Sequence, residues 1–99
     1  NGLVDLVMAC RANDVKITKV RKYMNGFIVY FEGEGGDAIL HDGSYGRTTG
    51  QWETIGFPWD GEDVSVHSAE NLAQLLAAVK IGADWRDVEA MWADIDDED

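Results

Sequence analysis

The sequence predicts one α+β domain: a three- or four-stranded antiparallel sheet with an N-terminal helix and two C-terminal helices packed on it. The chain has 99 residues, which suits one domain and is too short for two. Apolar residues make up 45% of the chain, so it can form a core. These residues recur at helical spacing near both ends and at strand spacing between them. We expect residues 1–99 to form the domain, with an acidic C-terminal end at 94–99.

The first third of the chain predicts a helix followed by a β-hairpin. Apolar residues at helical spacing predict a helix over residues 3–12. Residues 15–24 start with alternating apolar and polar side chains and predict a strand with one solvent-facing side and a bulge near its middle. Asn25 and Gly26 form a strong hairpin signal, because both tolerate positive φ. The apolar run 27–31 then predicts the central strand of the sheet.

The middle of the chain is less regular. Residues 38–41 predict a third strand. Residues 42–63 contain five glycines and the only proline, which predicts a long connection. Within this connection, residues 51–55 are a candidate fourth strand, and Phe57 and Trp59 are expected to contact the core.

Two helices are expected to close the domain. Ser68 is a favourable N-cap for a helix over residues 68–81, and Gly82 supplies its stop. Asp84 is expected to cap the last helix, residues 85–95. The apolar stripe of that helix consists of Trp85, Val88, Met91, Trp92 and Ile95, at spacings of three and four.

Charge is the strongest compositional feature. Nineteen acidic and eight basic residues give a net charge of −11. Five of the bases fall in residues 1–24, whereas residues 25–99 hold seventeen acids and three bases, a net of −14. Such a surface repels nucleic acid and anionic membranes and attracts basic surfaces. We therefore expect a protein partner with a basic nucleic-acid-binding surface, and neither direct nucleic-acid binding nor membrane binding. Solubility alone is the alternative explanation of the charge.

No pattern of residues indicates catalysis, a metal or a cofactor, and we expect none of the three. His41 and His67 are too few for a zinc site, and the lone Cys10 has the pattern of a small core residue. Ser65 lies near His67 but has no flanking nucleophile motif, so His67 is expected to be a satisfied polar residue. The glycine-rich segment 43–50 lacks the lysine and following helix of a phosphate-binding loop.

The acidic C-terminal end suggests a function in binding. Its five carboxylates are Asp94, Asp96, Asp97, Glu98 and Asp99. A helix C-terminus disfavours negative charge, so stability does not require this placement. A helix rises about 1.5 Å per residue, so the six residues would span about 9 Å and present one charge per about 1.8 Å. Duplex DNA carries one charge per about 1.7 Å, so the density favours mimicry of DNA, with a solvated chain end as the alternative.

Location follows from the apolar runs and the cysteine content. The longest apolar run is shorter than the roughly 20 residues that span a bilayer. The start shows no basic-then-apolar leader, and a lone cysteine forms no internal disulfide. We expect a cytoplasmic protein.

The order of elements and the charge resemble those of the small acidic phage-encoded anti-CRISPR proteins that inhibit a CRISPR nuclease. The elements that carry the resemblance are Leu3–Ala12, Val15–Met24, Phe27–Glu32, Ala38–His41, Ser68–Ile81 and Trp85–Ile95. The best-known member of that family combines a short N-terminal helix, a three-stranded antiparallel sheet and two closing helices. The resemblance implies a protein that blocks access of DNA to a nuclease by occupying its basic, DNA-reading surface.

Three hypotheses follow. The leading one is an acidic binding protein that inhibits a nucleic-acid-handling partner, with the carboxylates of the C-terminal end as binding residues. A second acidic patch is either Glu32, Glu34 and Asp37 on the predicted hairpin turn or Asp60, Glu62 and Asp63 in the long connection. The runner-up is a non-enzymatic structural or accessory protein that self-associates through aromatic surfaces. An enzyme with its site near His41 or His67 is the third.

Overall fold

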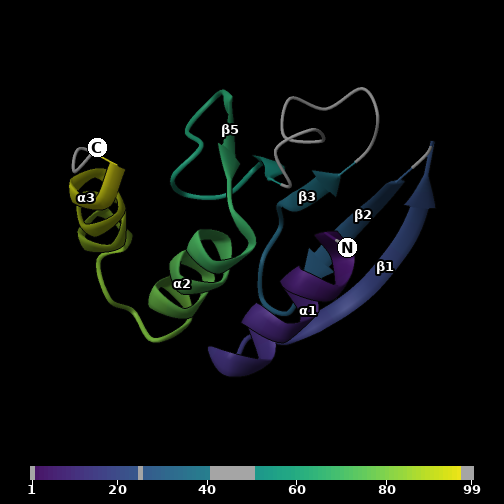
Figure 1. Ribbon diagram of the computed structural model, residues 1–99, viewed down its shortest axis with the longest axis horizontal. Helices are drawn as coiled ribbons and strands as arrows, with labels where there is room; N and C mark the ends of the chain where they lie inside the picture. The colour runs from purple at the N-terminus through teal and green to yellow at the C-terminus, as the bar shows by residue number, and fades with distance from the viewer. Residues whose placement is uncertain (1, 25, 41–50, 97–99) are drawn as a thin grey trace.

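The computed structural model of the protein describes residues 2–24, 26–40 and 51–96. Their elements, shown in Figure 1, are α1 (Gly2–Ala12), β1 (Ile17–Tyr23), β2 (Gly26–Phe31), β3 (Asp37–Leu40), β4 (Trp52–Ile55), β5 (Val64–His67), α2 (Ala69–Lys80) and α3 (Trp85–Asp96). The strands form one five-stranded antiparallel sheet in the order β1-β2-β3-β4-β5. The α+β class is confirmed. The expected number of three or four strands is wrong by at least one, because the sequence predicts no element at residues 64–67, where the structure has β5.

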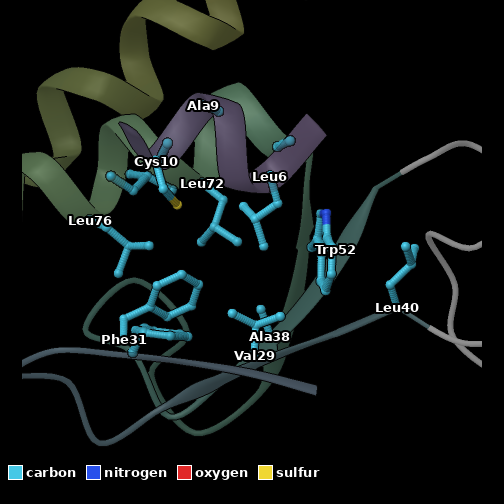
Figure 2. Packing of buried hydrophobic residues seen from close by; sticks show 14 of the residues in the cluster. Leu6, Ala9, Cys10, Val29, Phe31, Ala38, Leu40, Trp52, Leu72 and Leu76 are labelled. Atoms are coloured by element: carbon cyan, nitrogen blue, oxygen red, sulfur yellow. The ribbon is translucent and has the colours of Figure 1, made fainter. Parts of the chain in front are cut away.

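The core lies between one face of the sheet and the helices α1 and α2. Figure 2 shows Leu6 of α1 and Leu72 of α2 pointing toward Val29 and Ala38 of the strands. Trp52 of β4 is fully buried in the same cluster. Helix α1 packs on α2, and α2 in turn carries α3. We call the helix-covered side of the sheet the inner face.

The register of β2 confirms its central position. It pairs with β1 on one side and with β3 on the other. Val29 and Phe31 belong to the core cluster of the inner face. Ile28 is also buried but lies outside that cluster, and it pairs with Ile39 on the opposite face. The two faces of this strand are therefore both apolar, as its sequence predicts.

The first hairpin lies at the predicted place, but its turn consists of residues 24 and 25 and not of residues 25 and 26 as predicted. Tyr23 pairs directly with Gly26, so Gly26 already belongs to β2. Met24 has a φ of 54°, in the left-handed region that such a turn requires. Asn25 lies outside the described residues. The predicted bulge in β1 appears as a shift of register between Ile17 and Lys19.

The connection between β4 and β5 folds back across the inner face. Its Phe57 and Trp59 rings stack at 4.7 Å between centroids, and both side chains are buried as expected. The Phe57 ring also lies 6.0 Å from that of Phe31. The start of the connection lies close to the turn before β3, since a Cβ at Gly36 would lie 2.6 Å from the carbonyl oxygen of Ile55 and 2.9 Å from the carbonyl carbon of Gly56. A glycine is therefore required at this crossing.

The two C-terminal helices begin at the predicted caps. The Ser68 hydroxyl accepts a hydrogen bond from the Asn71 backbone N–H at 3.1 Å, and Gly82 ends α2 with a φ of 76°. Asp84 accepts from the Arg86 N–H at 2.9 Å at the start of α3. In the described part of the chain, no helix has the length and apolar character needed to cross a membrane.

The apolar stripe of α3 is only partly in contact with the rest of the domain. Trp85 and Val88 pack against the core. Met91 is 46% exposed, so its expected place in the stripe is wrong, because α3 packs mainly on one helix, α2. Trp92 is half-buried, and the side chain of Ile95 lies outside the described residues.

Candidate functional site

Four buried polar side chains and the half-buried Ser65 lie together on the inner face where β4, β5 and α2 meet. We call this group the polar cluster; it consists of Thr54, Asp60, Ser65, His67 and Asn71. Strand pairing places Thr54 beside Ser65, and the period of two along a strand places Ser65 and His67 on the same face. Asn71 comes from the first turn of α2, and Asp60 from the connection that folds over the sheet.

The carboxylate of Asp60 is the acceptor at the centre of this cluster. Its Oδ1 accepts from the Thr54 hydroxyl at 2.9 Å and also from the Ser65 hydroxyl. Its Oδ2 accepts from the Phe57 backbone N–H at 3.2 Å, while the Trp59 indole N–H donates to Thr54 Oγ1 at 3.2 Å. Several donors thus stabilise a carboxylate that is only 8% exposed.

His67 joins the cluster to the start of α2. Its Nε2 lies 2.7 Å from Ser65 Oγ, and its Nδ1 lies 2.6 Å from Asn71 Oδ1. The edge of the imidazole faces Trp59, with 6.1 Å between ring centroids. His67 is therefore a satisfied polar residue, as the sequence predicts.

The order Ser65, His67, Asn71 is that of a nucleophile, a base and an orienting group. The Ser65 hydroxyl, however, faces two acceptors, because Asp60 Oδ1 lies within hydrogen-bond distance of Ser65 Oγ as well as His67 Nε2. A hydroxyl has one hydrogen to donate, so the Asp60 carboxylate competes with His67 for it. This competition distinguishes the cluster from a triad in which the serine faces the base alone.

The acidic residues of the predicted hairpin turn differ in exposure. Glu32 is exposed and lies 3.7 Å from the ammonium group of Lys16. Glu34 and Asp37 are half-buried, and burial raises the pKa of both carboxyl groups. One oxygen of Asp37 is buried and has no hydrogen-bond partner in the described part of the chain. Glu32 is therefore the most accessible member of this group.

The second acidic group, in the long connection, needs a correction. Asp60 is buried and its carboxylate is satisfied internally, so it is not available to a partner and we withdraw it from the candidate set. No pattern in the sequence distinguishes it from its neighbours. Glu62 and Asp63 are exposed.

The acidic C-terminal end is described only in part. Helix α3 continues through Asp94 to Asp96, while Asp97, Glu98, Asp99 and the side chains from 94 onward lie outside the described residues. His41 and the glycine-rich segment 43–50 lie outside them as well. Two carboxylates of α3 that were not among the candidates, Asp87 and Glu89, are exposed and half-buried respectively.

Sheet order turns the uneven charge of the sequence into a separation in space. The basic residues Lys16, Lys19, Arg21 and Lys22 lie in or next to β1, at one edge of the sheet. The acidic helix α3 lies beyond the other edge, on the far side of α2 (Figure 1). Between described residues, the ion pairs are Lys16–Glu32, Lys80–Asp14 and Arg86–Asp84. The carboxylates of Asp87 and Glu89 are in none of them.

Comparison of the chain with protein-family models, with curated proteins and with solved structures gives no match. Within the described ranges, no three His, Cys, Asp or Glu side chains come together as ligands for a metal ion.

Proposed function

We propose that the protein is an acidic binding protein that inhibits a nucleic-acid-handling partner by occupying its basic surface. The observation that carries this proposal is the spatial separation of charge, with the basic residues at β1 and the acidic helix α3 beyond the opposite edge. A net charge of −11 arranged in this way attracts and orients a basic partner. The resemblance to phage anti-CRISPR proteins suggests a CRISPR nuclease as the partner and mimicry of DNA as the mechanism.

Helix α3 supports the proposal through its position. It contacts α2 and none of its residues 85–93 is buried, so it adds little to the core while it presents carboxylates to solvent. Asp94 and Asp96 continue the same helix toward the acidic end. An acidic helix on the outside of a domain can approach a basic groove without disturbing the fold.

The alternative of self-association through aromatic surfaces receives less support. Three of the aromatic side chains lie in the core, namely Trp52, Phe57 and Trp59. Their area is therefore used within the chain and is not available to a second copy.

The proposal is tested by capture of partners with immobilised protein from a bacterial lysate at low and at high salt. We compare the native chain with an α3-neutralised variant, which carries Asp87→Asn, Glu89→Gln, Asp94→Asn and Asp96→Asn. A charge-matched control carries Asp5→Asn, Asp14→Asn, Glu53→Gln and Glu70→Gln, which removes the same charge from parts of the chain outside α3. Duplex DNA is then added to the captured complex as a competitor.

We expect nucleic-acid-binding proteins to be captured at low salt by the native chain and by the control, and to be released by duplex DNA. Capture by the α3-neutralised variant should be much weaker, because the complementary charge has been removed. Equal capture by all three chains, or a complex that excess duplex DNA leaves intact, would contradict the proposal.

A further inference from the structure

A cavity of about 270 Å³ lies between α3 and the corner at which β5 leads into α2. Its wall includes Glu89 and Trp92 from α3, and His67 and Asn71 from the β5–α2 corner. Gln51, just before β4, contributes a further amide. The volume suits one amino-acid side chain rather than a large ligand. In Figure 1 the elements of this wall lie on the side of the molecule away from β1.

The α3 side of the cavity combines an aromatic ring with a carboxylate. Glu89 and Trp92 are three residues apart, so they lie on the same face of the helix. The Trp92 indole N–H donates to Gln74 Oε1 at 2.8 Å, which holds the ring in place. Glu89 has no hydrogen bond or ion pair with any residue of the described ranges. The nearby Arg86 is engaged elsewhere: it pairs with Asp84 and lies over the Trp85 ring.

The opposite wall holds an amide with an unused group. The side chain of Asn71 is only 7% exposed, yet it borders the cavity. Its Oδ1 contacts His67 Nδ1 at 2.6 Å, and its backbone N–H is bound by Ser68. The side-chain nitrogen, Nδ2, makes no hydrogen bond to a described residue, so it can donate to an acceptor on a ligand in the cavity.

These groups together define the chemistry of a ligand. The carboxylate and the ring face match a planar cation, since a guanidinium donates several hydrogen bonds to a carboxylate and stacks on an aromatic ring. The amide donor requires a carbonyl oxygen nearby. A phosphate-bearing ligand would meet the repulsion of Glu89 and of a net charge of −11.

We propose that this cavity binds an arginine residue of the basic partner. The guanidinium lies over the Trp92 ring and pairs with Glu89, and a backbone carbonyl of the same segment accepts from Asn71. The inference rests on the proposed function, because it names the group through which a basic partner is anchored beside α3.

The probe is N-acetyl-L-arginine N-methylamide, titrated into the whole protein and followed by two-dimensional proton–nitrogen NMR at physiological salt. The chain has four tryptophans, so the Trp92 indole resonance is assigned with the variant Trp92→Phe. We expect this resonance to shift in a saturable way. The citrulline analogue, in which a neutral urea replaces the guanidinium, should bind roughly tenfold more weakly because it lacks the charge-assisted hydrogen bonds. The lysine analogue should also bind more weakly, because a point charge does not stack.

A pair of variants on one helix separates the cavity from general attraction by charge. Glu89→Gln and Asp87→Asn each remove one negative charge from α3, but only Glu89 borders the cavity. We expect Glu89→Gln to weaken binding of the arginine probe by roughly tenfold and Asp87→Asn by less than about twofold, since an exposed charge is screened by salt.

Two results would overturn the inference: equal binding of the arginine and citrulline probes, or equal losses of binding in the two variants. The titration uses the protein without a partner, so failure of the arginine anchor can be distinguished from failure of the proposed function. If the probe fails to bind while partner capture depends on α3 charge, the proposed function holds and the arginine anchor is rejected. If the probe binds but the α3-neutralised variant captures partners as well as the native chain does, the proposed function fails instead.

Discussion

Helices α2 and α3 each have 12 residues and are neighbours in the chain, yet they have opposite roles in the domain. Helix α2 has seven buried residues and packs against α1, α3 and the sheet. In α3 none of the residues 85–93 is buried, and its main contacts are with α2. Helix α2 therefore forms part of the core, whereas α3 packs on α2 and exposes negative charge to solvent.

This difference shows how a small domain can carry an unfavourable charge. Helix α2 contributes seven buried residues, whereas in the described part of α3 Trp85 and Val88 pack against the core while remaining partly exposed. Acidic residues at the C-terminal end of a helix oppose its dipole, but on a peripheral helix this cost is small and local. The comparison predicts that substitutions in α2 change folding, whereas substitutions of α3 carboxylates change binding.

The largest expected effect is on the core face of α2. Leu75 is fully buried, so Leu75→Ala removes apolar contacts and leaves a cavity. We expect the free energy of unfolding to fall by about 3 kcal/mol, measured by urea denaturation. Met91→Ala on α3 is the matched control, since this side chain is 46% exposed and should cost less than about 0.5 kcal/mol. Similar losses for the two variants would show that α3 belongs to the core.

The next largest effect is on the polar cluster beneath the start of α2. His67→Leu removes the hydrogen bonds that the imidazole makes with Ser65 Oγ and Asn71 Oδ1, and it should lower stability by about 2 kcal/mol. Glu62→Gln, an exposed change in the connection above the cluster, is the control and should lie within about 0.5 kcal/mol of the native chain. Thermal unfolding followed by circular dichroism distinguishes the two. An unchanged melting temperature for His67→Leu would mean that the cluster contributes no stability.

The sequence predicts local features better than features that need the whole fold. The Ser68 cap and the apolar pattern of β2 depend on neighbours in the chain, and both are confirmed. The sequence does not indicate a strand at β5, because the inward-facing residues of this strand, Ser65 and His67, are polar. That reverses the usual pattern of apolar inside and polar outside. The alternation of Val64 and Val66 was the only signal.

The same limit explains the error about Asp60. Its burial depends on the connection folding back over the inner face and on two hydroxyl groups from different strands. These groups meet only in the folded chain, so no spacing in the sequence reveals them. The exposed acids Glu62 and Asp63 need no such assembly, and a solvent-exposed position is the default for charged residues in a connection.

A smaller effect is expected at Asp37, and it depends on pH. Burial raises the pKa of its carboxyl group. The folded chain therefore binds this proton more tightly than the unfolded chain does. Stability falls as pH rises through the range in which the carboxyl group ionises, because the charged form is costly to bury. Below that range the carboxyl group is protonated and this cost is absent. Asp37→Asn removes the charged form and should raise the melting temperature slightly at neutral pH. The gain should disappear at pH values at which the native carboxyl is protonated.

Glu62→Gln again serves as the comparison, since this carboxylate is exposed. Melting temperatures across the acidic to neutral range should converge for Asp37→Asn and the native chain as pH falls. A gain that is the same at every pH would mean that the burial of charge at Asp37 is not its cause.

The most direct test of the binding role of α3 is the affinity for the captured partner as a function of ionic strength. The native chain, the α3-neutralised variant and the charge-matched control are compared in the same titration. We predict a steep loss of affinity with salt for the native chain and the control, and a weaker and flatter dependence for the α3-neutralised variant, with its melting temperature unchanged. Equal affinities and equal salt slopes for all three chains would contradict the account.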